Sequence, residues 1–253
     1  MHIAGQGALV FGGASGLGEA TAFLLAERGA SVVVADRDTT RGPKVAAGIG
    51  GRFVETDVTD EDGVAAAVGA AGEGAPLRMA VNCAGIGWAE RLLRPDGTVH
   101  AAAGFEKVVR VNLLGSFHVL RLAAAAMAAT DPADGGERGV VINTASVAAF
   151  DGQVGQVAYA ASKGAVTALT LPAARDLAPV GIRVCTIVPG LMDTPLAGKM
   201  PERNRASIEA QVPYPARFGQ PAEFAALAVH IVENQYLNGT CIRLDAGLRL
   251  AYR

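Results

Sequence analysis

Cysteine, histidine and net charge are all scarce in this chain of 253 residues, which has three cysteines, four histidines and a formal net charge of −2. The cysteines lie far apart without CxxC spacing, so we expect no disulfide framework and a reduced, cytoplasmic environment. The histidines lack the spacing of metal ligands, so we expect no metal site. A chain this close to neutrality has no electrostatic attraction for nucleic acid or for an anionic membrane.

Long apolar runs are missing too. No run without charged residues reaches the ~18 residues that a membrane-spanning helix requires. The opening stretch MHIAGQGALVFGG has no basic region ahead of its apolar residues, so we expect neither a signal peptide nor an Arg-rich presequence. Hydrophobic residues still make up 51% of the chain, and a chain of this length can bury a large core without disulfides or metals.

Short apolar segments alternate with longer alanine-rich segments along the whole sequence. The strand candidates are 8–12, 31–36, 52–57, 78–85, 139–146, 182–190 and 241–247, and the helix candidates lie near 16–28, 60–71, 105–129, 158–178 and 221–234. Continuously apolar strands that alternate with helices are typical of a parallel sheet covered on both faces. We therefore expect an α/β fold: one doubly wound domain over residues 1–253, with a seven-stranded parallel sheet and helices on both faces. Pro172 should kink or break the helix that contains it.

Two long polar segments interrupt this alternation, at about 88–105 and 191–221. Both follow predicted strands, and ligands bind at the carboxyl ends of the strands in such sheets. Loops of this length within a compact domain are more often functional than idle. We interpret both as substrate loops.

The segment FGGASGLGEA joins the first strand to the first helix. Gly12, Gly16 and Gly18 permit a tight turn and a close backbone approach, and the free N–H groups of the helix start favour a pyrophosphate. A strand–helix turn with a purely structural role would look similar. Asp36 ends the second strand, where a carboxylate would bind an adenosine ribose and repel a 2′-phosphate. We therefore expect NAD rather than NADP, although Arg37 could instead cover that phosphate.

Two further strand ends fit a dinucleotide. Asp57, at the end of the third strand, could meet an adenine amino group, and Val58 could offer its backbone. The alternative reading is helix capping by Thr59 or Asp60, and both readings can hold together. The fourth strand ends in small or amide-bearing residues suited to a ribose, namely Asn82, Ala84 and Gly85.

The segment VAYAASKGAV, residues 157–166, places Tyr159 and Lys163 on one face of a predicted helix. Neither is a good base alone at neutral pH, because a phenol titrates near ~10 and an amine near ~10.4. Together and beside a cationic nicotinamide, the ammonium would lower the pKa of the phenol, which would make Tyr159 a general base for an alcohol proton. Ser146, at the end of the fifth strand, could hold the same substrate oxygen. The alternative for the pair alone is an exposed amphipathic helix face.

Taken together, these motifs resemble the short-chain dehydrogenase/reductase family over nearly the whole chain. Its motifs match the Gly12–Gly18 turn, Asp57, NCAG at 82–85, Asn112 in VNLLGSF, Ser146, YAASK at 159–163 and PGLMDTP at 189–195. The resemblance implies a Rossmann fold with Asn112, Ser146, Tyr159 and Lys163 as catalytic residues. Asn112 would hold a water in a proton relay from Lys163. It implies NAD contacts from Gly12, Ser15, Gly16, Leu17, Gly18, Asp36, Asp57, Val58, Asn82, Cys83, Ala84, Gly85, Tyr159, Lys163, Pro189, Gly190, Met192 and Thr194.

Two residues depart from the family's pattern. Phe11 stands where the family usually has a threonine whose hydrogen bond stabilises the glycine turn, so we expect a more mobile turn that still binds through its backbone. Cys83 replaces the commoner second asparagine of the fourth-strand motif.

Within the family, the stretches RGVVINTASVAAFDGQVGQVAYAASKG, QVPYPARFGQPAE and LNGTCIRLDAG are most similar to the type 2 3-hydroxyacyl-CoA dehydrogenases. That resemblance implies NAD-dependent oxidation of an L-3-hydroxyacyl-CoA to the 3-ketoacyl-CoA, in a homotetramer. The substrate would meet Ser146, Tyr159, Gln153 and Gln156. The basic residues of the two loops, Arg91, Arg94, Lys199, Arg203 and Arg205, could meet CoA phosphates or could be ordinary solvated charges.

Two alternatives stay open. The first keeps the chemistry and changes the substrate, to a steroid, a sugar alcohol or a free hydroxy acid. The second is a nucleotide-binding protein without turnover, against which the intact acid/base set argues.

Overall fold

The strands form one sheet in which every pair of neighbours is parallel, in the order β3-β2-β1-β4-β5-β6-β7. The computed structural model describes residues 1–195, 197–199 and 202–252. The strands are β1 Gly7–Phe11, β2 Ser31–Asp36, β3 Arg52–Glu55, β4 Leu77–Asn82, β5 Gly139–Thr144, β6 Ile182–Pro189 and β7 Cys241–Leu244. The predicted doubly wound α/β fold is confirmed, with all seven strands at their predicted places.

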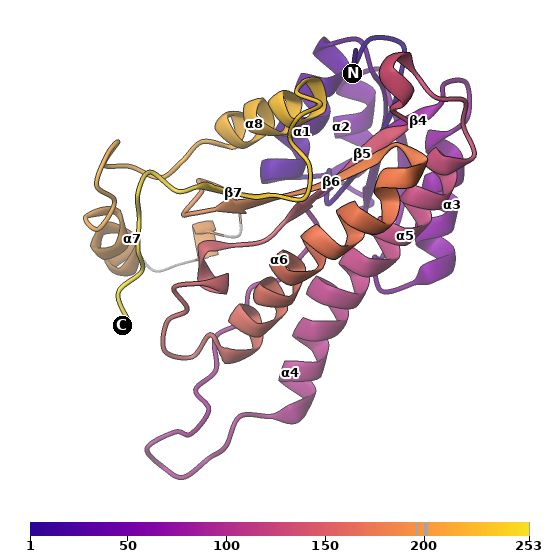
Figure 1. Ribbon diagram of the computed structural model, residues 1–253. Helices are drawn as coiled ribbons and strands as arrows, with labels where there is room; N and C mark the ends of the chain where they lie inside the picture. Colours follow the sequence, from indigo (N-terminus) through magenta and orange to yellow (C-terminus); the bar gives the residue numbers. More distant parts are fainter. Residues whose placement is uncertain (196, 200–201, 253) are drawn as a thin grey trace.

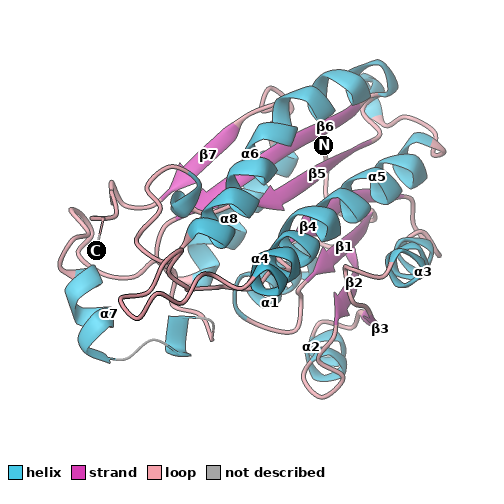
Figure 2. Cartoon of the chain, turned by 90° about the horizontal axis from the view of Figure 1, so that it is seen from below, coloured by secondary structure: helices cyan, strands magenta, loops and turns pink. Residues whose placement is uncertain are grey.

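Helices cover both faces of this sheet (Figures 1 and 2). They are α1 Gly16–Glu27, α2 Gly42–Gly48, α3 Glu61–Ala71, α4 Ala102–Val109, α5 Gly115–Ala128, α6 Val157–Leu177, α7 Glu202–Glu209 and α8 Pro221–Glu233. One core cluster joins the sheet to α1, α2 and α8, and a second joins it to α3, α5 and α6. Successive strand residues alternate between the two clusters: Val10 and Ile142 face the first, whereas Leu9 and Val141 face the second. Burial on both faces is why the central strands read as continuous apolar runs.

The predicted break at Pro172 is not found, and a kink at that position stays a prediction. Helix α6 runs without interruption from Val157 to Leu177 with Pro172 inside it. A proline removes one backbone donor from the helix. The buried side chains of α6, which include Val166, Thr170 and Ala174, pack against the sheet and hold the helix together across that position.

Two short helices, α2 and α7, were not anticipated from the sequence. Glycine and proline in GPKVAAG indicate a turn, but Gly42 is needed there for packing. A Cβ atom at Gly42 would lie 2.1 Å from the ring of Phe53. The α7 segment lies within the predicted 191–221 loop, of which residues 196, 200 and 201 lie outside the described part of the chain.

The stretch Ala102–Ala128 is long and apolar enough to cross a membrane, judged by length and composition alone (mean hydropathy 1.4). It comprises α4, the π-helical turn Arg110–Leu114 and α5. Several of its residues, such as Val108, Val119, Ala123 and Met127, are fully buried in the protein. The apolar composition of this stretch therefore fits a helix that covers the sheet.

Both long polar segments leave the sheet at the carboxyl ends of strands, as expected. The first follows β4 and forms an arm that projects away from the body of the protein (Figure 1). A bridge between Leu93 and Val99 closes the arm. The second follows β6 and carries α7. The same edge carries the turns after β1 and β5, so residues far apart in the sequence meet there.

Candidate active site

The glycine turn between β1 and α1 has no room for side chains. A Cβ atom at Gly12 would lie 2.7 Å from the backbone nitrogen of Ala84, and one at Gly18 would lie 2.1 Å from the carbonyl oxygen of Gly12. Gly12 also has a positive φ of 69°, which favours glycine. Ser15 is the N-cap of α1. The turn therefore presents backbone N–H groups and one hydroxyl at a helix start, a donor set that fits the phosphates of a dinucleotide.

Asp36 fastens the glycine turn to the end of β2. Its Oδ2 atom accepts a hydrogen bond of 3.0 Å from the Ala14 N–H, and its Oδ1 atom accepts one of 2.9 Å from the Asp38 N–H. The backbone N–H of Gly12 also donates to the carbonyl of Ala35, at 2.9 Å. Phe11 itself is fully buried in the core. The turn thus has other hydrogen bonds where the family's threonine is lacking, and its greater mobility stays a prediction.

Asp57 lies close to Arg37, the residue that follows Asp36 in the sequence. An Nη1 atom of Arg37 is 3.7 Å from Oδ2 of Asp57, and Oδ1 of Asp57 accepts hydrogen bonds from both the N–H and the hydroxyl of Thr59. The pKa of Asp57 is lowered, because these hydrogen bonds and the charge of Arg37 outweigh the opposing effect of burial, the largest single contribution. Asp60 caps α3, through a bond from the Asp62 N–H, so the adenine and capping readings do use different residues.

Two predicted NAD-contact residues already have hydrogen-bond partners, Val58 through its backbone and Asn82 through its side chain. The carbonyl of Val58 lies 3.1 Å from Nδ1 of His118. The Asn82 amide donates to the hydroxyl of Ser116 at 2.9 Å and accepts from the Ala84 N–H at 3.1 Å. Asn82 is buried. Its side chain therefore shapes the turn that carries Cys83, Ala84 and Gly85.

Ser146 and Tyr159 lie together at the carboxyl edge of the sheet. Ser146 follows β5 and caps the short 3₁₀ helix Val147–Ala149, and Tyr159 lies in the first turn of α6. Burial raises the pKa of Tyr159, and a hydrogen bond with Ser146 opposes that rise. The lowering of this pKa by Lys163 is expected beside a bound nicotinamide, so it stays a prediction for the occupied site.

Lys163 is deeply buried, with 4% of its surface exposed. Its Nζ atom donates a 2.8 Å hydrogen bond to the backbone carbonyl of Thr144 at the end of β5. Burial lowers the pKa of Lys163 to about 8, with a smaller opposing contribution from Cys83. The Thr144 hydroxyl donates to the Cys83 thiol at 3.8 Å, so Cys83 is close to this site. Burial raises the pKa of Cys83 to about 12. A thiol this reluctant to ionise is unreactive at neutral pH.

Asn112 lies at the centre of the π-helical turn Arg110–Leu114, a helix irregularity that is frequent at functional sites. Its amide pairs with both backbone groups of Ile86: Oδ1 accepts from the N–H at 2.8 Å and Nδ2 donates to the carbonyl at 3.0 Å. Nδ2 also donates to the Ser162 hydroxyl at 3.1 Å, which in turn donates to the Tyr159 carbonyl at 2.8 Å.

Gly85 shows how close the catalytic candidates lie. A Cβ atom there would be 3.2 Å from Oδ1 of Asn112 and 3.3 Å from Nζ of Lys163. The two groups therefore face one small space, which glycine keeps open. The structure thus brings Asn112, Ser146, Tyr159 and Lys163 together. The sequence reasoning missed Ser162 and the backbone of Ile86, whose only signal was their place inside or beside the motifs.

The loop after β6 comes back to the glycine turn. The side chain of Thr194 lies against Gly16, where a Cβ atom would be 3.2 Å away. Pro189 ends β6, and the Gly190 N–H donates to the Leu244 carbonyl at 2.9 Å. Met192 is buried and lines a cavity of about 190 Å³ under the 191–221 loop. Thr194 is therefore well placed for a cofactor held by the turn, whereas Met192 packs beneath the loop.

The predicted substrate residues lie in the loop that joins the 3₁₀ helix to α6. The Gln153 N–H donates to the Gln156 side chain at 3.0 Å, and the Gln153 amide donates to the Ala251 carbonyl at 3.0 Å. Both glutamines are thus engaged in holding this loop.

Among the basic residues of the two substrate loops, Arg94 is 3.7 Å from Glu90 and Arg205 is 3.0 Å from Asp193. Arg91 is exposed. The side chains of Lys199 and Arg203 lie outside the described residues.

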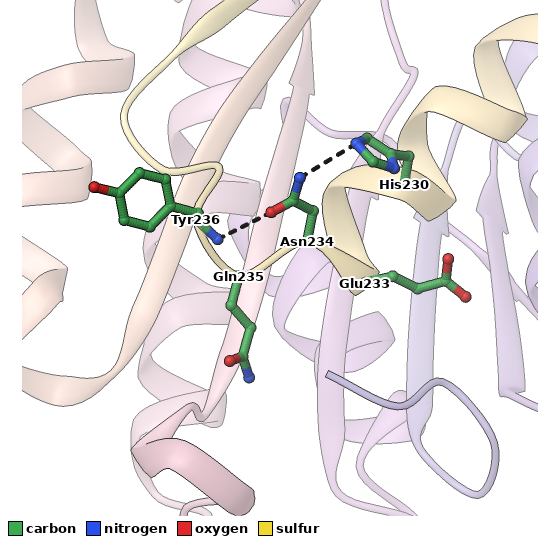
Figure 3. A pocket seen from close by; sticks show the side chains of 5 residues that line it. All are labelled: His230, Glu233, Asn234, Gln235 and Tyr236. Carbon is green, nitrogen blue, oxygen red and sulfur yellow. Dashed lines mark hydrogen bonds between the residues drawn. The ribbon is translucent and has the colours of Figure 1, made fainter.

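A second, shallow hollow lies far from this edge, at the end of α8 (Figure 3). It is lined by His230, Glu233, Asn234, Gln235 and Tyr236. The Asn234 amide lies 3.3 Å from the His230 ring and Glu233 pairs with Arg28. Arg183, at the start of β6, donates to carbonyls of the same segment. The hollow thus lies at the amino edge of the sheet, opposite the candidate site.

Comparison with known proteins decides the family. Residues 6–205 match the family model described as short chain dehydrogenase. This chain belongs to the short-chain dehydrogenase family. Family membership makes the protein an oxidoreductase of CH–OH groups, and dehydrogenases of this family generally use NAD or NADP. The glycine turn described above fits such a dinucleotide.

The short-chain dehydrogenase relatives of this chain include curated proteins of nearly equal length. It is 49% identical to human 3-hydroxyacyl-CoA dehydrogenase type-2 over 98% of this chain and 97% of the relative. It is 48% identical to the Drosophila melanogaster protein of the same name over 96% of each. A crystal structure of 3-hydroxyacyl-CoA dehydrogenase type-2 from Mycobacterium avium superposes with a TM-score of 0.95 at 44% identity and covers 98% of each chain. The resemblance inferred from the sequence motifs is confirmed.

Proposed function

We propose that this protein is an NAD-dependent dehydrogenase that oxidises an L-3-hydroxyacyl-CoA to the 3-ketoacyl-CoA. One observation carries the proposal: proteins named 3-hydroxyacyl-CoA dehydrogenase type-2 are 48% to 49% identical to this chain over nearly its full length. The grouping of Ser146, Tyr159, Lys163 and Asn112 at one sheet edge supports turnover. A protein that only binds nucleotides has no use for that set.

In this proposal Tyr159 removes the proton of the substrate hydroxyl as general base, and Ser146 holds the same oxygen by a hydrogen bond. Bound NAD would supply the hydride acceptor. Lys163 lies one helical turn from Tyr159, and its buried charge favours the phenolate once the site is occupied. The Asn112 amide forms hydrogen bonds with the backbone of Ile86 and with the Ser162 hydroxyl. Ile86 thereby keeps its place beside Gly85, and Ser162 keeps its place in the first part of α6. In the small space that Gly85 keeps open, Asn112 would hold the relay water that leads from Lys163.

Asp36 supports NAD as the cofactor. Its carboxylate lies at the tip of β2 beside the glycine turn, where it would accept hydrogen bonds from ribose hydroxyls and repel a 2′-phosphate. Arg37, the residue that would favour NADP, faces Asp57 at 3.7 Å. NAD would further rest on Ser15, and on the backbone beside Leu17.

The acyl-CoA would lie between the loop that carries Gln153 and Gln156, the arm and the 191–221 loop. Arg91 forms no ion pair among the described residues. It is therefore our candidate for a CoA phosphate.

We also propose a cytoplasmic homotetramer. Helices α5 and α6 and the turn that precedes α5 expose large apolar side chains, with Leu114 46%, Phe117 46% and Leu171 45% accessible. Such groups favour burial between subunits. The three cysteines are free, which fits a reducing compartment.

The test is formation of NADH by the purified protein with NAD and 3-hydroxybutyryl-CoA, against the free hydroxy acid and a hydroxysteroid. We expect a clear preference for the thioester. Activity with the free acid or the steroid alone would refute the substrate assignment and leave the catalytic residues standing. Tyr159→Phe separates an enzyme from a binder: turnover should be lost while the protein still binds NAD.

A further inference from the structure

One loop connects the segments that carry two of the catalytic side chains, Ser146 and Tyr159. Residues 150–156 follow the 3₁₀ helix that Ser146 begins and lead into α6, which carries Tyr159. The loop includes Gln153 and Gln156. Any displacement of this loop would therefore move the substrate relative to Ser146 and Tyr159.

Two distant segments hold the backbone of this loop from either side. The Glu90 N–H, in the arm, donates to the Gly155 carbonyl at 2.8 Å. The Val154 N–H donates to the Tyr252 carbonyl at 3.0 Å, in the C-terminal segment 245–252. The Ala251 N–H of that segment also donates to the Gln211 side chain at 3.3 Å, just after α7. The C-terminal segment therefore connects the loop with the 191–221 loop.

Arg243, on β7, is the charged centre of this arrangement. Its Nη2 atom donates to Asp151 in the loop at 2.7 Å and to the Leu248 carbonyl at 3.1 Å, and its Nε atom donates to Asp245 at 2.6 Å. The guanidinium carbon lies 5.4 Å from the centre of the Phe150 ring. The side chains of Arg243, Asp151 and Asp245 are 24%, 20% and 9% exposed. Water therefore screens these contacts less than it screens a surface ion pair.

The turn that Arg243 holds is strained. Ala246 has a φ of 52°, in the left-handed region that is unfavourable for residues with a Cβ atom. Asp245 accepts the Gly247 N–H at 3.1 Å, and its carbonyl accepts the Leu248 N–H at 2.9 Å. Such a conformation persists only where its surroundings enforce it. Without Arg243 on Asp245, the turn and the segment after it would relax.

We propose that Arg243 is a positioning residue that fixes the loop 150–156 against the C-terminal segment and thereby sets the placement of the substrate. Arg243 acts through Asp151 and Asp245 and does not itself belong to the acid/base group. The proposal rests on the proposed function for the class of substrate. It assigns discrimination among substrates to a residue of β7, outside both long loops.

The decisive variants are Arg243→Gln and, as a milder change to the same pair, Asp151→Asn. Arg249→Gln is the matched control. Arg249 is 60% exposed and pairs with the same Asp245 oxygen at 3.0 Å, and its described contacts reach only Asp245 and Leu248. Each protein is assayed as the full chain with NAD and with short- and long-chain 3-hydroxyacyl-CoA, and its dissociation constant for NAD is measured by titration.

We expect Arg243→Gln and Asp151→Asn each to raise KM for the thioester about tenfold, which corresponds to about 1.4 kcal/mol. The kcat value and the NAD dissociation constant should stay within about twofold, and Arg249→Gln should change none of them further than that. Arg243→Lys should restore part of the loss, because a lysine keeps the charge without the fork of donors. The double variant should resemble Arg243→Gln, since that change already removes the contact with Asp151.

Trp88, the only tryptophan in the chain, gives a readout without substrate. Its indole N–H donates to Glu90 at 3.3 Å, and Glu90 holds Gly155. Loosening of the loop should therefore raise the quenching of Trp88 by acrylamide in Arg243→Gln and Asp151→Asn, but not in Arg249→Gln.

An unchanged KM together with unchanged quenching overturns the proposal, as does an equal loss of kcat, NAD affinity and thermal stability. If the parent enzyme oxidises another secondary alcohol instead of the thioester, the proposed function fails. The KM comparison is then made with that alcohol, and it still decides the role of Arg243.

Discussion

Replacement of Lys163 by methionine should abolish the reaction and yet stabilise the fold. Lys163 is 4% exposed, and burial lowers its pKa from 10.5 to about 8. Each pKa unit corresponds to 1.36 kcal/mol, so the buried ammonium costs about 3 kcal/mol near neutral pH. Methionine has a similar shape and no charge. It leaves the Thr144 carbonyl without its 2.8 Å donor, which costs about 1 kcal/mol.

We therefore expect Lys163→Met to be about 2 kcal/mol more stable than the parent protein at about pH 7, or about 4–8 °C higher in Tm. The sign of the pH dependence follows from proton binding. Between about pH 8 and 10.5 the unfolded parent chain binds more protons at Lys163 than the folded one, so the parent gains stability as the pH rises. At about pH 9.5 the destabilisation by the buried Lys163 corresponds to only roughly one pKa unit, because the folded protein holds the amine neutral there. The stability advantage of Lys163→Met should therefore fall to nearly zero.

The assay is urea unfolding of NAD-free protein at equal protomer concentration, at both pH values. Lys44→Met, which replaces an exposed lysine, is the control. Its difference in stability from the parent protein should be the same at both pH values. If Lys163→Met is less stable than the parent at neutral pH, or if the gap between the two proteins does not narrow with pH, the electrostatic argument is refuted.

Two other residues give sharp expectations. Asp36→Asn removes the carboxylate that would face a 2′-phosphate, so kcat/KM with NADP should rise at least about tenfold relative to NAD; unchanged selectivity would mean that Arg37 or another group decides it. Ser162→Ala removes the hydroxyl between the Asn112 amide and the Tyr159 carbonyl, so kcat should fall about tenfold with little change in NAD affinity. Thr167→Ala, which loses a comparable bond to a helix carbonyl, is the control, and an equal effect of both changes would make Ser162 merely structural.

Local sequence was sufficient for the seven strands and for the longer helices of this fold, whereas the short helices α2 and α7 were missed. Runs such as GVVINT and IRVCTIVP are typical of strands buried on both faces, and each ends in residues that meet at one edge of a parallel sheet. Glycine at positions 12 and 18 follows from the close backbone contacts that the turn makes. Tyr159 and Lys163 share a helix face because of their spacing.

Tertiary structure alone decided the partners of these residues. The Asn112 amide bonds to Ile86 and Ser162, which are 26 and 50 positions away, and Gln153 bonds to Ala251, which is 98 positions away. Burial raises the pKa of Tyr159, which the sequence could not predict because hydration depends on the whole enclosure, whereas the helix spacing gives only one neighbour. Pro172 likewise stays inside α6 because packing outweighs one missing hydrogen bond. The sequence determined which groups reach the active edge, whereas burial and contacts between distant segments determined their charge and their orientation.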